Sequence, residues 1–130
     1  MPLQPGMGGY HITQSSLIEV AVYWSPQIDA NGSQLVDDYG KALFNPPCQI
    51  FCKWDEKTVV FLDNKGNTQY SKAVVRVQYP VLELGVLWYG LLQNINPSGD
   101  PFDNDDAWEI RLYTEERSRW GNSVLMIATL

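Results

Sequence analysis

Residues 53–77, KWDEKTVVFLDNKGNTQYSKAVVRV, constrain the fold more than any other part of the chain. Two runs rich in Val, Phe and Tyr flank the sequence DNKG, in which Asp and Asn favour a turn entry and Gly66 permits a positive φ. The pattern predicts a hairpin between a strand over 58–63 and a second strand that Pro80 ends. One face of that second strand carries side chains suited to the core, namely Ser71, Ala73, Val75 and Val77.

Five further segments have the composition and alternation of β-strands. They cover residues 17–24, 48–54, 86–92, 108–114 and 123–130. Seven short strands with almost no helical periodicity predict an all-β fold, a small antiparallel β-barrel or sandwich with long loops and a flexible N-terminal arm. A length of 130 residues suits one domain.

The segments between the expected strands define the domain organisation. An arm over 1–16 begins with eleven residues rich in Pro, Gly and Met, and a single β-barrel domain follows over 17–130. Its two long loops cover 25–47 and 94–107, and within the first, residues 33–43 allow a short helical turn. Loops of this length in a compact domain are usually functional or mobile.

Charge and hydropathy exclude some classes of protein. The formal net charge of −6 argues against gripping nucleic acid through its phosphates, although an acidic surface is compatible with DNA sliding past. No apolar run approaches the roughly 20 residues that cross a bilayer, and the start lacks the features of a secretion signal. We therefore expect a product of the cytoplasm that does not enter a membrane.

Residues with catalytic chemistry are sparse. His11 is the only histidine and falls in the expected arm, so a Ser–His or Cys–His mechanism has no support. Cys48 and Cys52 are four residues apart, which in a strand separates their Cα atoms by roughly 13 Å, too far for a disulfide. We expect buried, unreactive thiols, no enzyme activity, no cofactor and no metal site.

Two features leave alternatives open. The loop sequence GDPFDNDDAWE is predicted to be a solvated acidic loop, with an adventitious divalent site as the alternative. The five tryptophans and seven tyrosines favour core and subunit contacts. Stacking on a ligand is the alternative, and it would make the chain a small carbohydrate-binding β-barrel module.

A resemblance rests on Trp54 and on five segments, FLDNKG, YSKAVVRV, LELGVLWYG, DAWEIRLY and LMIATL. Their spacing and residue types, over about residues 52–130, resemble the head-completion or head-closure (stopper) neck proteins of tailed bacteriophages. The resemblance implies a small β-barrel that forms a homo-oligomeric ring in the virion neck, below the portal or adaptor protein and above the tail terminator or tail tube protein. Such a ring closes the DNA channel after packaging and docks the tail, while DNA passes without sequence-specific binding. A tail terminator or another connector ring protein is the alternative within virion proteins.

Candidate residues follow from this expectation. The last strand is apolar on both faces, so a partner subunit would cover one of them. The candidate subunit-interface residues are Tyr70, Val74, Tyr113, Leu125, Ile127 and Leu130. The candidate channel-facing residues are Asp100, Asp103, Asp105 and Asp106. The 1–11 arm and the 25–47 loop are assigned to contacts with the adaptor or the tail.

Overall fold

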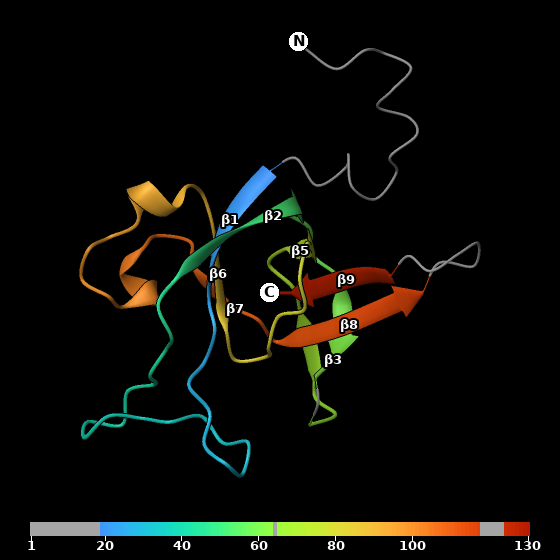
Figure 1. Ribbon diagram of the computed structural model, residues 1–130. Helices are drawn as coiled ribbons and strands as arrows, with labels where there is room; N and C mark the ends of the chain where they lie inside the picture. Colours follow the sequence, from blue (N-terminus) through green and yellow to red (C-terminus); the bar gives the residue numbers. More distant parts are fainter. Residues whose placement is uncertain (1–18, 64, 118–123) are drawn as a thin grey trace.

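The computed structural model describes residues 19–63, 65–117 and 124–130 (Figure 1). The expected N-terminal arm lies outside the described residues. The described strands, all paired antiparallel, are β1 Glu19–Trp24, β2 Cys48–Asp55, β3 Val60–Leu62, β4 Thr68–Tyr70, β5 Val74–Val77, β6 Val86–Tyr89, β7 Trp108–Glu109, β8 Leu112–Arg117 and β9 Val124–Thr129. Two 3-10 helices, η1 Leu92–Asn94 and η2 Pro101–Asp103, accompany them. No α-helix occurs in the described ranges, and the all-β prediction is confirmed.

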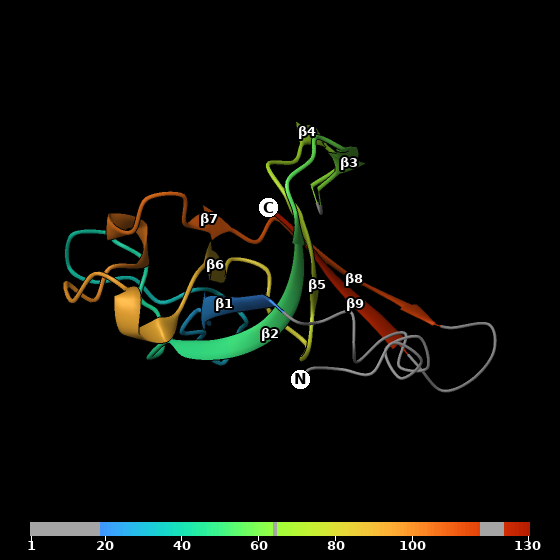
Figure 2. The same ribbon diagram turned by 90° about the horizontal axis from the view of Figure 1, so that it is seen from above.

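Seven strands form one curled sheet in the order β7-β6-β1-β2-β5-β9-β8, which makes a half-barrel (Figure 2). Its two edge strands, β7 and β8, are consecutive in the chain. Between them, the Ile110 N–H donates to the Gly85 carbonyl before β6 (2.8 Å), and the Arg111 N–H donates to the Thr129 carbonyl in β9 (2.8 Å). The expected strand over 108–114 is therefore divided, and its two halves draw the edges of the sheet together.

Strands β3 and β4 form a separate two-stranded sheet, as the hairpin prediction requires. Gly66 has φ 82°, and the Asp63 carboxylate accepts the amide hydrogens of Lys65 and Asn67, each at 2.9 Å. The single strand expected up to Pro80 is divided into β4 and β5, since β4 ends at Tyr70 and β5 begins at Val74.

The break between β4 and β5 is a β-bulge at Lys72 and Ala73. The Lys72 N–H donates to the Leu130 carbonyl (2.7 Å), and the Leu130 N–H donates to the Ala73 carbonyl (2.9 Å). Lys72 and Ala73 therefore lie together opposite the single residue Leu130. Val74 then starts β5, which pairs with β2 and β9 in the large sheet. The polar pair Ser71 and Lys72 thus marks the point where the chain leaves the hairpin and enters the half-barrel.

The main core fills the inner face of the half-barrel. The face predicted for the core is confirmed, since Ser71, Ala73, Val75 and Val77 are all buried. Side chains from β1, β2, β6 and the segment after β7 join it, including Ala21, Ile50, Cys52, Leu87 and Ile110. Because strand side chains alternate, every second residue of β1 and β6 points to the opposite face of the sheet.

A second cluster covers that opposite face of β1 and β6. Val22, Trp24 and Val86 pack there with Ala107, and Phe44 and Ile95 lie against them. Phe44 comes from the 25–47 loop and Ile95 from the 94–107 loop, so each long loop contributes to the cover. Both loops lie on the same side of the half-barrel (Figures 1 and 2).

The 25–47 loop consists of three extended legs joined by two tight turns. Its bridges are Pro26 to Phe44, Ile28 to Gln34 and Val36 to Ala42. A closed ring of three backbone hydrogen bonds joins the legs: Gln27 N–H to Leu43 O (3.0 Å), Leu43 N–H to Leu35 O (2.9 Å) and Leu35 N–H to Gln27 O (2.8 Å). The expected helical turn over 33–43 is wrong, because Gly40 at φ 79° closes a tight turn where a helix would continue.

Candidate assembly surfaces

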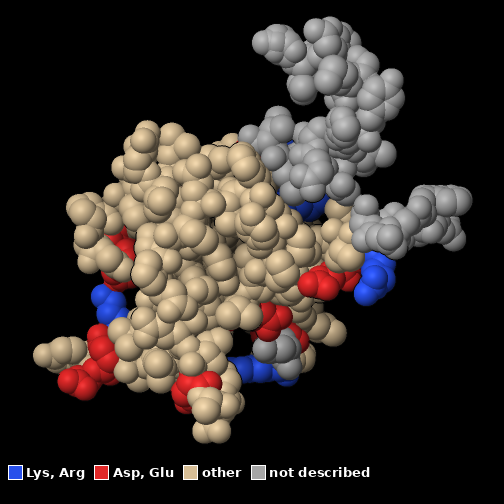
Figure 3. Space-filling model, viewed as in Figure 1, with Lys and Arg blue, Asp and Glu red and all other residues tan. Residues whose placement is uncertain are grey.

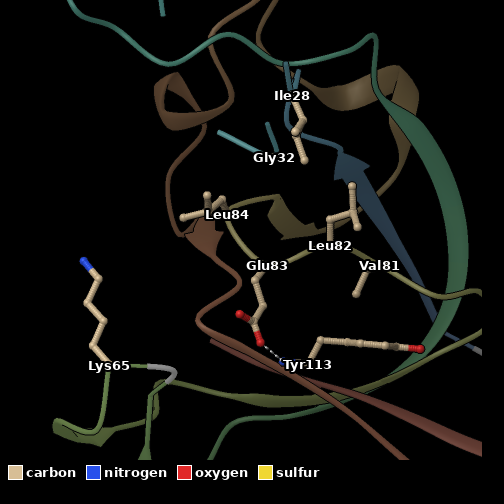
Figure 4. A pocket seen from close by; sticks show the side chains of 8 residues that line it. All are labelled: Ile28, Gly32, Lys65, Val81, Leu82, Glu83, Leu84 and Tyr113. Carbon is tan, nitrogen blue, oxygen red and sulfur yellow. Dashed lines mark hydrogen bonds between the residues drawn. The ribbon is translucent and has the colours of Figure 1, made fainter. Parts of the chain in front are cut away.

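An apolar groove lies between the half-barrel, the 25–47 loop and the tip of the β3–β4 hairpin (Figure 4). Its volume is about 580 Å³. Its lining comprises Ile28, Gly32, Lys65, Val81, Leu82, Glu83, Leu84 and Tyr113. Four separate segments of the chain thus supply the walls, and tertiary folding alone brings them together.

The 81–85 segment is held in place by specific bonds. The Leu82 N–H donates to the Tyr23 hydroxyl (2.8 Å), and the Leu84 N–H donates to the Ile110 carbonyl (3.0 Å). The Glu83 carboxylate accepts the Tyr113 N–H (3.1 Å), as the dashed line in Figure 4 shows. The side chains of Leu82 and Leu84 remain partly exposed in the groove, where they offer apolar surface to a ligand or a neighbouring protein.

A smaller, polar hollow of about 230 Å³ adjoins this groove and shares Lys65, Glu83 and Leu84 with it. Arg111 lines the hollow and connects the hairpin to the half-barrel. Its guanidinium donates to Gln69 Oε1 (3.2 Å), to the Tyr70 carbonyl and to the Leu130 carbonyl (2.8 Å). It also lies 5.1 Å from the centre of the Phe61 ring, a cation–π distance. Arg111 therefore fixes the inner face of the hairpin.

The outer face of the hairpin is apolar and exposed. Val60 pairs with Tyr70 across the two strands, and their exposed fractions are 60% and 62%; Leu62, on the same face, is 63% exposed. A two-stranded hairpin usually turns apolar residues inward, so this exposed set indicates a contact surface. Tyr70, a predicted interface residue, belongs to it.

The other predicted interface residues divide between the two faces of the sheet. Val74 in β5 and Leu125 and Ile127 in β9 share the face opposite the main core, because Val75 and Ala128 alternate with them and are buried. The structure thus groups these three, all half-buried, on one surface. Tyr113 lies on the core side and lines the groove.

Leu130, predicted as an interface residue, is instead buried within its own chain. Its exposed fraction is 1%, and it packs in the main core of its own chain. Leu130 comes two residues after the buried Ala128 and therefore lies on the same, inner face, so it presents no surface to a neighbour. Alternation separates Leu130 from Leu125 and Ile127, but it could not show which face is buried, because the run over 123–130 is apolar at nearly every position.

The acidic loop does not gather its carboxylates. Asp100 accepts the Phe102 N–H (3.0 Å) and pairs with Lys41 Nζ at 2.6 Å, and this hydrogen bond to Lys41 holds the pKa of Asp100 below its usual range. Asp103, Asp105 and Asp106 are exposed. Among the described residues, no group of three or more His, Cys, Asp or Glu side chains is arranged to hold a metal ion.

Sequence reasoning missed an internal repeat that shapes the 25–47 loop. Residues 28–35 and 36–43 share an eight-residue pattern, Ile or Val, then Asp-x-x-Gly-x-x-Leu. In the second copy, the Asp37 carboxylate accepts the amide hydrogens of Tyr39 (2.8 Å) and Lys41 (3.0 Å). The same Asp-x-x-Gly turn forms the hairpin tip at 63–66. The signal that could have revealed the repeat was the eight-residue spacing of Asp and Gly.

The second turn of the repeat presents an aromatic side chain to solvent. Tyr39 is 94% exposed, more than any other large hydrophobic side chain in the described residues. The turn lies at the lower left tip of the molecule in Figure 1. The Lys41–Asp100 pair ties its base to the 94–107 loop.

An aromatic pair at the start of β1 is the other surface of interest. The rings of Trp54 and Tyr89 lie 5.4 Å apart, and the Glu19 carboxylate accepts the Tyr89 O–H (2.8 Å) and the Trp54 backbone N–H (2.8 Å). The hydrogen bond from the Trp54 backbone, followed by that from Tyr89, lowers the pKa of Glu19.

The thiol prediction is half right. Both cysteines are free, but Cys48 is exposed and only Cys52 is buried. Burial, with the nearby Glu19 charge adding to it, raises the pKa of Cys52 to about 12. Burial also raises the pKa of Cys48, although less, because its side chain is at the surface.

Charged side chains lie mainly along the margins of the face shown in Figure 3, and its centre is free of them. The described residues include no helix of a length and hydropathy that would span a membrane. Comparison with models of protein families, with curated proteins and with solved structures finds no match to this chain.

Proposed function

We propose that this chain is a structural subunit of the neck of a tailed phage, which forms a ring below the portal or adaptor, closes the DNA channel and docks the tail. The single observation that carries the proposal is the presence of several separate apolar contact surfaces on one small half-barrel. The groove, the outer face of the hairpin and the 37–41 turn each expose large hydrophobic side chains. A ring subunit needs different patches for its two neighbours and further patches for the proteins above and below.

The sequence resemblance supplies the specific assignment to the phage neck. The resembling segments form the hairpin, the bulge and the strands that close the half-barrel, so they include the hairpin face and the part of the groove that lies outside the 25–47 loop. The acidic residues Asp103, Asp105 and Asp106 border the channel in this proposal, where their charge repels DNA and prevents it from sticking. The 1–11 arm and the 25–47 loop contact the adaptor or the tail.

Imaging of the neck tests the proposal directly. Mass spectrometry of purified particles is expected to find the chain, and cryo-electron microscopy is expected to place it as a ring between the portal and the tail. A particle without the chain would refute the assignment. A ring with the acidic loop on its outer wall would refute only the channel-facing role. Deletion of residues 1–11 is expected to impair tail attachment; unimpaired attachment would count against the role of the arm.

A carbohydrate-binding module is the second candidate, and the Trp54–Tyr89 pair favours it. The two tilted rings can stack on a sugar ring, and the Glu19 carboxylate beside them can accept hydrogen bonds from the sugar hydroxyl groups. Titration of the protein with a panel of sugars, followed by tryptophan fluorescence, distinguishes the two candidates. Saturable quenching that Trp54→Ala abolishes would support sugar binding, and an unchanged spectrum would oppose it.

A further inference from the structure

We infer that Tyr39 of one copy inserts into the apolar groove of a second copy, and that this contact joins neighbouring subunits. The inference rests on the proposed ring and names the surfaces that would form it. The groove walls that receive Tyr39 are Ile28, Leu82, Leu84 and Tyr113.

The 37–41 turn holds Tyr39 in place before any partner arrives. The Asp37 carboxylate fixes the Tyr39 and Lys41 amides, and the Gly40 N–H donates to the Asp37 carbonyl (3.0 Å). The three-way ring of backbone bonds and the Lys41–Asp100 pair secure the legs below the turn. A rigidly presented aromatic loses little conformational freedom on binding, which is typical of the residues that dominate interface energies.

The groove matches this side chain in size and chemistry. Its volume of about 580 Å³ accommodates a tyrosine ring, and its walls are largely aliphatic. The lining holds one basic residue, Lys65, and one acidic residue, Glu83, whose carboxylate accepts the Tyr113 N–H. Asp38, which is exposed and precedes Tyr39, carries the charge that complements Lys65 when the turn enters the groove.

The two surfaces are distinct, as a head-to-tail contact requires. Tyr39 is 94% exposed, so it does not occupy the groove of its own chain. The 37–41 turn forms one tip of the molecule, whereas the groove lies between the first turn of the same loop, the hairpin tip and the half-barrel (Figures 1 and 4). A contact between different patches leaves each copy with one free turn and one free groove, so it can propagate and close into a ring.

Disulfide trapping between two single-site variants tests the contact. One protein carries Tyr39→Cys and a second, of different mass, carries Leu82→Cys, both in a Cys48→Ser background. The matched control replaces the Leu82 variant with Phe51→Cys, because residues 82 and 51 have similar exposed fractions of 48% and 50%. We expect the mixed disulfide for the 39–82 pair and not for the 39–51 pair.

An association measurement supplies the second readout. Tyr39→Ala is expected to weaken self-association by about 10–100-fold in analytical ultracentrifugation, the loss typical of an interface hot spot. Tyr79→Ala, at another exposed tyrosine, is expected to leave it unchanged. Because both positions are exposed, neither change should affect folding.

The outcomes separate this inference from the proposed function. Rings in the neck without the 39–82 disulfide would overturn the contact and leave the function standing. The disulfide in a protein absent from virions would retain the contact and refute the function. A strictly monomeric protein that forms no 39–82 disulfide at its highest soluble concentration would overturn the contact.

Discussion

Replacing Ser71 by Ala removes the hydroxyl that joins the two chain segments at the base of the hairpin. Ser71 is buried, and its Oγ–H donates to the Lys57 carbonyl (2.7 Å) while its Oγ accepts the Val59 N–H (2.8 Å). The change therefore leaves one backbone acceptor and one backbone donor without their partner. The Lys57 carbonyl and the Val59 N–H are only partly buried, so water replaces part of the lost hydrogen bonding.

The expected cost follows from these two bonds. Each contributes about 0.5–1.5 kcal/mol net, so Ser71→Ala should lower the free energy of unfolding by about 1–2 kcal/mol. With an unfolding entropy of about 2.1 cal/mol/K per residue, this corresponds to a Tm lower by about 4–7 °C for a chain of this length.

Urea unfolding followed by tryptophan fluorescence measures the change, and calorimetry gives the Tm. Ser33→Ala, at an exposed serine of a turn, is the matched control and should stay within about 0.5 kcal/mol of the parent. A Ser71→Ala protein as stable as the control would refute the view that this hydroxyl secures the base of the hairpin.

Three further predictions concern other parts of the fold. Arg111→Ala removes the bonds that hold the hairpin, so it should destabilise the hairpin by about 1–3 kcal/mol and speed amide hydrogen exchange more in β3 and β4 than in β1. An equal increase in exchange in both regions would contradict this. The pKa of Asp100 is depressed in the folded state, so its pairing with Lys41 stabilises the protein fully above the ordinary carboxyl pKa of about 3.9, and this stabilisation is lost as the pH falls through the lower folded pKa. Asp100→Asn should remove that part of the acid sensitivity of the protein. An unchanged acid transition would count against the pairing. A thiol reagent at mildly alkaline pH should modify Cys48 alone in the native protein and both cysteines in denaturant, since Cys52 is buried with a pKa near 12; rapid labelling of Cys52 in the native state would show that the core opens.

The predicted interface residues show how much of the surface could be predicted from the sequence. Val74, Leu125 and Ile127 do share one surface, as alternation in strands requires. Leu130 lies on the core side because it alternates in step with the buried Ala128, which separates it from Leu125 and Ile127. Tyr113 lies on the core side because the division of the 108–117 segment changes which face its residues take. Such a change depends on pairing with distant strands and leaves no mark in local alternation.

The sequence by itself determined the local elements. Val-rich runs with period two gave strands, Asp-x-x-Gly gave tight turns, and the face from Ser71 to Val77 was set by alternation, because each depends on neighbours close in the chain. Only the tertiary structure decided that β4 and β5 belong to different sheets, that 108–117 joins both edges of the half-barrel, and that Ile28, Leu84 and Tyr113 meet in one groove. These arrangements depend on hydrogen bonds and burial between segments far apart in the chain, whose partners no single stretch of residues specifies.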